Sequence, residues 1–178
     1  MAHLLSLDQS ITALGYSIWH IHSNQHCSLI QYGIIKLDKK LSYFERIISL
    51  ERILDQLLSS YPITIAVLED IQKHRGVSLT TYKKLAYLHF FLTYYFYTRS
   101  IDCHTIHVNT WRAGLKKVIG IPNVKKSTVH QFYYTLFQQP ADFTTDMSDS
   151  LGLAIHMCKN ILGVESIMLN EAKLKHLP

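Results

Sequence analysis

The sequence contains little cysteine: only Cys27, Cys103 and Cys158 occur among 178 residues. These three residues form no CxxC pair and leave one thiol over in any disulfide pairing, so a disulfide framework is not indicated. A reducing, intracellular compartment is therefore the expected setting.

Long apolar runs are also missing. No stretch of about 18 uncharged apolar residues, the length that would span a bilayer, is present. The N-terminal MAHLLSLDQS reaches Asp8 too early for the apolar region of a signal peptide. The most apolar helical stretch, 79–97, is short for a membrane span and is interrupted by His89. We therefore expect a soluble protein with no membrane partner.

No internal repeat, low-complexity tract or Pro/Ser-rich linker divides the chain. Its 178 residues and 48% hydrophobic composition suffice for one substantial core, so we predict a single domain over residues 1–178. Lys and Arg total 18 against 13 Asp and Glu, a formal charge of +5 that favours a polyanionic partner such as nucleic acid.

The spacing of apolar residues predicts an α/β fold. Strands are predicted at 4–8, 14–21, 27–37, 63–69 and 101–108. Helices are predicted at 43–58, with Ser42 as N-cap, and at 79–97, 111–118, 125–137 and from 146 onwards. Hairpins come first and helical crossovers later, which indicates a mixed five-stranded sheet flanked by helices.

Four acidic residues stand at positions typical of a metal site. Asp8 and Glu69 end predicted strands, while Asp146 and Asp149 lie three apart on one face at the start of a helix. Clustered carboxylates repel one another unless a cation is present, and hard oxygen ligands suit Mg²⁺ or Mn²⁺. A pair of such ions could activate water and stabilise the leaving oxygen of a phosphodiester.

Three of these acids also have a structural interpretation, whereas Glu69 is harder to explain in this way because an unpaired buried carboxylate is costly. Asp146 could cap its helix, with Asp149 favourable in the first turn, and Asp8 could be a turn residue. Asp70 should point away from Glu69 if the strand continues, which favours a supporting role. Trp111 could stack on a base, although packing in the core is the favoured interpretation.

Several motifs follow one another along the chain. They are Asp8 followed by Gly15-Tyr16, Glu69 at the end of the fourth strand, GIPNVKKSTV at 120–129, and DMSDSLGLAIH at 146–156. In this order they resemble the motifs of the RuvC-type Holliday-junction resolvases, within the ribonuclease H-like superfamily. The resemblance spans residues 4 to about 160. Gln72 stands where bacterial members carry an aromatic residue, which indicates a divergent member of phage or viral kind.

The resemblance implies a ribonuclease H-like fold and metal-assisted hydrolysis of branched DNA, especially four-way junctions, leaving a 5′-phosphate. It implies a catalytic set of Asp8, Glu69, Asp146 and Asp149 as metal ligands, with Lys126 as the active-site lysine. The cofactor is expected to be Mg²⁺ or Mn²⁺, with two ions in each active site.

Basic and aromatic residues predict two further surfaces. The expected contacts to DNA phosphates are Lys73, Arg75, Arg112, Lys116, Lys117 and Lys125. Helix 79–97 carries more aromatic surface than one sheet-facing stripe can cover, which predicts a homodimer with Leu88, Phe91 and Tyr95 at its interface.

Two other functions are compatible with the sequence. The acids alone do not name the polymer, so a ribonuclease H-like nuclease acting on RNA/DNA hybrids or flaps is one alternative. The other is a catalytically silent protein that binds junctions, although the intact set of four acids argues against it.

Overall fold

The computed structural model describes residues 2–22, 26–73, 76–120, 125–138, 140–169 and 173–177. The expected DNA contact Arg75 and residues 121–124 of the GIPNVKKSTV motif lie outside the described residues.

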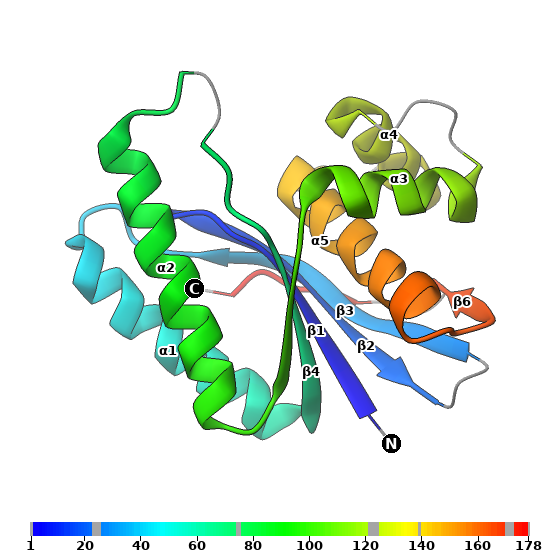
Figure 1. Cartoon of the computed structure of the whole chain (residues 1–178), viewed down its shortest axis with the longest axis horizontal. Coiled ribbons are helices and arrows are strands. Elements are labelled where there is room, and N and C mark those ends of the chain that lie inside the picture. Colours follow the sequence, from blue (N-terminus) through cyan, green and yellow to red (C-terminus); the bar gives the residue numbers. More distant parts are fainter. Residues whose placement is uncertain are drawn as a thin grey trace.

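A mixed β-sheet forms the centre of the protein (Figure 1). Its long strands are β1 (Ala2–Asp8), β2 (Ala13–Ile21), β3 (His26–Lys36), β4 (Ile63–Glu69) and β5 (Asp102–Ile106), in the spatial order β5-β4-β1-β2-β3. The first three strands form the predicted antiparallel meander, while β4 and β5 run parallel to β1. The predicted α/β class and mixed sheet are confirmed.

The predicted count of five strands is wrong, because two short strands extend the sheet. These are β6 (Ser166–Met168) and β7 (Lys173–Leu174), and both pair in parallel with β3. Segments this short carry no readable alternation of apolar residues. Their position is set by the backbone groups that β3 leaves unpaired and by the hydroxyl of Tyr16, which donates to the Lys175 carbonyl at 2.8 Å.

Helices cover both faces of the sheet (Figure 1). One layer holds α1 (Tyr43–Ser60) and α2 (Leu79–Thr98); the other holds α3 (Val108–Ile119), α4 (Lys126–Leu136) and α5 (Thr145–His156), which continues as the π-turn η1 (Met157–Ile161). Ser42 caps α1 in a full capping box with Glu45, as predicted.

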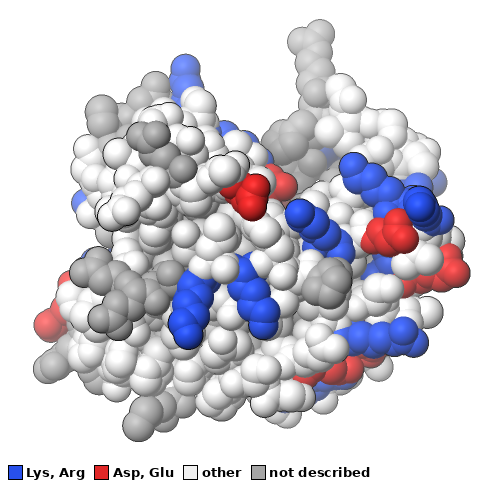
Figure 2. All heavy atoms as spheres, turned by 180° about the vertical axis from the view of Figure 1, so that it is seen from behind, with Lys and Arg blue, Asp and Glu red and all other residues white. Residues whose placement is uncertain are grey.

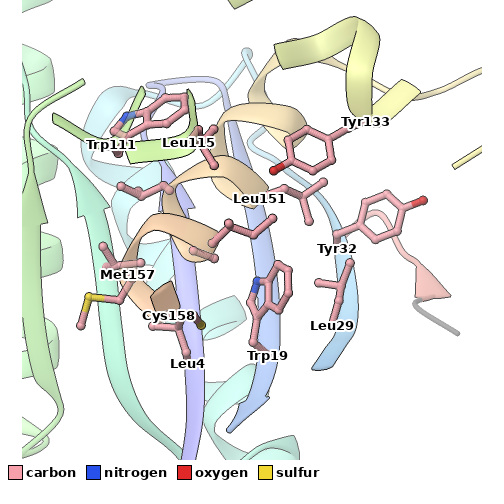
Figure 3. Close-up of a cluster of buried hydrophobic side chains, with 14 of the residues drawn as sticks. Leu4, Trp19, Leu29, Tyr32, Trp111, Leu115, Tyr133, Leu151, Met157 and Cys158 are labelled. Carbon is pink, nitrogen blue, oxygen red and sulfur yellow. The ribbon is translucent and has the colours of Figure 1, made fainter. Parts of the chain in front are cut away.

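The side chains of β1 alternate between the two faces of the sheet and so contribute to two hydrophobic cores. Leu5 and Leu7 pack under α1 and α2, whereas Leu4 packs under α3 to α5 (Figure 3).

Helix α5 packs closely against the sheet. The hydroxyls of Ser6 and Ser17 donate to the carbonyl of Ser150 at 2.8 and 3.2 Å, which ties the helix to β1 and β2. A Cβ atom at Gly15 would overlap the backbone carbonyl of Asp146. Only glycine therefore allows this approach, which brings the start of α5 beside the end of β1.

The expected dimer residues on α2 require a correction. Leu88 and Tyr95 are each 1% exposed and belong to the chain's own core, because α2 buries this stripe against the sheet. Phe91 is half-buried. The aromatic side chains exposed on α2 are Tyr87, Phe90, Tyr94 and Tyr97. The helical period thus predicted an excess of aromatic surface, but it did not identify which stripe faces outward. In the described ranges, no helix is long and apolar enough to cross a membrane.

Candidate active site

Asp8 and Glu69 lie side by side at the carboxyl ends of two neighbouring strands in the interior of the sheet. Strands β1 and β4 are parallel neighbours, and both end on these residues. Leu4 precedes Asp8, and Val67 precedes Glu69, by an even number of residues, so each pair shares one face of its strand. Because Leu4 and Val67 point into the core under α5, Asp8 and Glu69 face that side as well. Asp70 is one residue further on and interacts electrostatically with His89 of α2, in the opposite layer.

Asp146 and Asp149 approach the same place from α5. Thr144 is the N-cap of this helix, since its side chain accepts a hydrogen bond from the Met147 amide at 3.4 Å. The interpretation of Asp146 as the cap is therefore wrong. Asp146 is partly exposed, whereas Asp149 is only 3% exposed. A nearly buried carboxylate is costly unless other groups compensate its charge.

The four carboxylates interact strongly through space. Burial, followed by the charges of Glu69, Asp149 and Asp146, raises the pKa of Asp8 well above its ordinary value. Burial also raises the pKa of Glu69 and that of Asp149, in both cases despite nearby groups that act in the opposite direction. Three separate segments of the chain thus concentrate negative charge that a divalent cation would stabilise.

Two basic side chains contact this cluster. The ammonium of Lys126, the first residue of α4, lies 3.3 Å from Asp146 Oδ1 and 3.2 Å from Asp149 Oδ2. Arg112 of α3 reaches Asp149 Oδ2 at 3.4 Å. Lys126 is therefore at the acids, where the motif placed it. Arg112, which the sequence assigned to DNA phosphates, contacts an acid of the candidate site directly.

Sequence reasoning missed the polar role of Trp111. Its side chain is fully buried in the core, the interpretation favoured from sequence (Figure 3). Its indole Nε1–H also donates to Glu69 Oε2 at 2.8 Å and so orients this carboxylate. The available signal was that a buried indole N–H needs an acceptor and that a carboxylate ending an apolar strand needs a partner.

The chemistry of this cluster fits a divalent metal. In the ranges that the structure describes, no three His, Cys, Asp or Glu side chains are already arranged to hold one ion. Lys126 instead binds the two acids of α5, while Trp111 holds Glu69. Among the described residues, however, Asp149 Oδ1 is buried without a hydrogen-bond partner, and the donor set is entirely carboxylate oxygen.

The remaining basic residues assigned to DNA lie on the surface. Lys73 is exposed after β4, Lys116 and Lys117 are exposed in the last turn of α3, and Lys125 is exposed just before α4. On the face opposite to that of Figure 1, Lys and Arg are spread singly or in small groups, several beside Asp and Glu (Figure 2). The described residues therefore show no continuous basic patch on that face, and the assigned contacts remain a prediction.

Known structures share this fold. This chain superimposes on Thermus thermophilus RuvC in complex with a Holliday-junction substrate, with a TM-score of 0.70 and 13% identity over 90% of this chain and 96% of the other. The yeast mitochondrial Holliday-junction resolvase Ydc2 gives 0.63 and 13%, covering 89% of this chain and 78% of that one. Fowlpox virus resolvase, in complex with Holliday-junction DNA, gives 0.51 and 18%, covering 90% and 99%.

Comparison of the sequence identifies the family. No curated protein matches the sequence significantly. The sequence model described as crossover junction endodeoxyribonuclease RuvC matches residues 4–157, most of the chain and all four acids. With its ribonuclease H-like sheet and its acidic cluster, this chain belongs to the RuvC family of crossover junction endodeoxyribonucleases.

Proposed function

We propose that the protein resolves four-way DNA junctions through one acidic site per chain, in which Asp8, Glu69, Asp146 and Asp149 hold Mg²⁺ or Mn²⁺, with two ions per site. RuvC-type resolvases depend on a divalent metal. The residue assignment rests on one observation. Four carboxylates from β1, β4 and α5 converge on one place and repel one another. The free thiols of all three cysteines support action in a reducing compartment inside the cell.

The chain's own residues prepare this site. When bound, the ions would activate the attacking water and stabilise the leaving oxygen. Trp111 fixes one oxygen of Glu69, and α5 is fixed to the sheet through Ser150, so the carboxylates are positioned before substrate arrives. Lys126 binds the acids of α5 in this structure. With a divalent ion bound to these acids, the Lys126 ammonium would be free to contact the scissile phosphate.

Lys126→Ala should slow cleavage by roughly 10²-fold, because a positioned positive charge near the reacting phosphate is lost. Single-turnover cleavage of a labelled junction at saturating protein measures this effect separately from binding. Lys125→Ala is the matched control, since Lys125 is the exposed neighbour and forms no ion pair with Asp146 or Asp149. Equal rates for Lys126→Ala and the parent protein would exclude the role proposed for Lys126.

A second copy of the chain completes the proposed mechanism. Each chain has one acidic site, whereas a four-way junction is near two-fold symmetric and must be cut at a symmetric pair of positions. The exposed aromatic face of α2, namely Tyr87, Phe90, Tyr94 and Tyr97, is suited to pair with its own copy about a two-fold axis. This face replaces the buried stripe of Leu88 and Tyr95 as the proposed interface.

Junction binding should weaken steeply as salt increases, because lysines at phosphates release condensed counterions. Measured without divalent metal, Lys116→Ala and Lys117→Ala should each reduce the slope of log affinity against log salt by about one. Glu165→Gln, an exposed acid far along the chain, should leave the slope unchanged. A parental affinity that hardly varies with salt would show that these basic residues do not form the binding surface.

A panel of substrates tests the proposed function. With Mg²⁺ or Mn²⁺, the protein should cut an immobile four-way junction in preference to a linear duplex, a flap and an RNA/DNA hybrid. Preferred cleavage of the hybrid or the flap would favour the alternative nuclease. Tight junction binding without cleavage in either metal would indicate the silent binding protein.

A further inference from the structure

Gln9, the residue that follows Asp8, connects three elements around the acidic site. Its side-chain Nε2 lies 2.6 Å from the backbone carbonyl oxygen of Glu69 and 2.8 Å from Nδ1 of His89. An amide nitrogen carries two hydrogens, so it can donate both bonds at once. The end of β1, the end of β4 and the middle of α2 thereby meet at one side chain.

This bridge lies where the strand pairing ends. The last backbone pair between β1 and β4 is Leu7 with Leu68, so Asp8 and Glu69 stand just beyond it. Glu69 pairs with Ile106 of β5 on its other side. The Gln9 side chain thus supplies the cross-strand hydrogen bond that the β1–β4 backbone no longer makes, at the residues that carry the two acids.

His89 holds the bridge from the opposite layer. His89 Nδ1 lies 2.8 Å from Gln9 Nε2 and 3.2 Å from Gln9 Oε1, and its Nε2 lies 3.5 Å from the Thr105 hydroxyl of β5. Nδ1 accepts from the amide nitrogen when the ring hydrogen is on Nε2, and it donates to the amide oxygen when the hydrogen is on Nδ1. His89 is half-buried on α2 among residues that face the sheet, while its neighbour Phe90 is 71% exposed on the proposed dimer face. The helix proposed to mediate dimerisation is therefore linked to the acids through a directional hydrogen bond.

We infer that Gln9 and His89 are positioning residues that set the separation of the Asp8 and Glu69 carboxylates and thereby tune the affinity for divalent metal. The inference rests on the proposed function, since it takes these two acids as metal ligands. Neither residue contacts the reacting atoms. Hydrogen bonds behind metal ligands commonly change metal affinity by about 10- to 100-fold when they are removed.

The test measures Mn²⁺ binding to the full chain without DNA, by calorimetry and by electron paramagnetic resonance. Gln9→Met and His89→Leu, which keep size but remove the hydrogen bonds, should each weaken Mn²⁺ binding about tenfold. His89→Asn offers an acceptor near the position of Nδ1 and should restore affinity to within about threefold of the parent. Junction binding without metal should stay unchanged in all three variants.

Controls separate a positioning role from general destabilisation. Thr93→Val removes a hydroxyl that bonds only the backbone of α2, so it should leave Mn²⁺ affinity unchanged whatever its effect on thermal stability. The inference is overturned if the folded Gln9→Met and His89→Leu proteins bind Mn²⁺ like the parent, or if Thr93→Val weakens binding as much. Asp8→Asn and Glu69→Gln serve in the same assay: unchanged binding in both would overturn the proposed metal site itself.

Discussion

Asp8→Asn, Glu69→Gln and Asp149→Asn are each expected to abolish junction cleavage while leaving junction binding intact. Each substitution removes one carboxylate charge, so it weakens the metal site without removing any lysine from the surface. A loss of several kcal/mol of transition-state stabilisation corresponds to a rate lower by on the order of 10³-fold. Single-turnover cleavage and a binding assay without metal, on the same preparations, measure the two properties.

The matched control is Asp102→Asn, which removes an exposed carboxylate at the opposite end of the sheet, where β5 begins. It should cleave at the parental rate. The thermal stability of the metal-free proteins supplies an independent check. Because burial and the other three acids raise the pKa of Asp8, the fold disfavours its charged form. Asp8→Asn should therefore raise the melting temperature by roughly 2–4 °C. Two acid variants that retain full cleavage would contradict the assignment.

Phe90→Glu and Tyr94→Glu are expected to yield folded monomers that nick junctions but rarely resolve them. These side chains are 71% and 58% exposed, and their rings stack 6.1 Å apart on the outer face of α2. A two-fold interface would bury two new charges for each substitution, at a cost of about 3 kcal/mol or more, so dimer affinity should fall by on the order of 10²-fold. Analytical ultracentrifugation measures the dimer, and a supercoiled cruciform separates nicking from paired cutting.

Ile161→Glu provides the control, because Ile161 is also exposed but lies in the other helical layer. It should remain dimeric and resolve junctions. Tyr95→Glu should instead unfold the protein, since Tyr95 is buried and its hydroxyl donates to Asp55 at 2.7 Å. A parental protein that sediments as a monomer, both free and with junction DNA, would contradict the interface and the paired cuts.

The sequence predicted the elements that position the acids because their apolar periods are strong. The run ITIAVLE and the short apolar run at 4–8 indicated strands ending on Glu69 and Asp8, and both strands end there. The spacing of three residues between Asp146 and Asp149 was sufficient to place both near the start of one helix. Resemblance to a family then linked acids that are distant in sequence, which periodicity alone could not do.

What the sequence did not predict depends on tertiary contacts. The hydrogen bond from Trp111 to Glu69 and the bridge through Gln9 and His89 join residues 42 and 80 positions apart. No local pattern encodes such pairs. The sequence also could not predict which stripe of α2 faces outward, because aromatic residues occupy most of the circumference of this helix. Strands β6 and β7 are defined by their pairing with β3, which lies far away in the sequence.

Mn²⁺ binding to the four acid variants tests the central claim most directly, because it measures the metal site without relying on cleavage. Electron paramagnetic resonance titrations of the parent, Asp8→Asn, Glu69→Gln, Asp146→Asn and Asp149→Asn would be compared with those of Asp102→Asn. We predict Mn²⁺ binding by the parent and by Asp102→Asn, and affinities at least about tenfold weaker in the four acid variants. Parental affinity in any two of those four would contradict the assignment of the site.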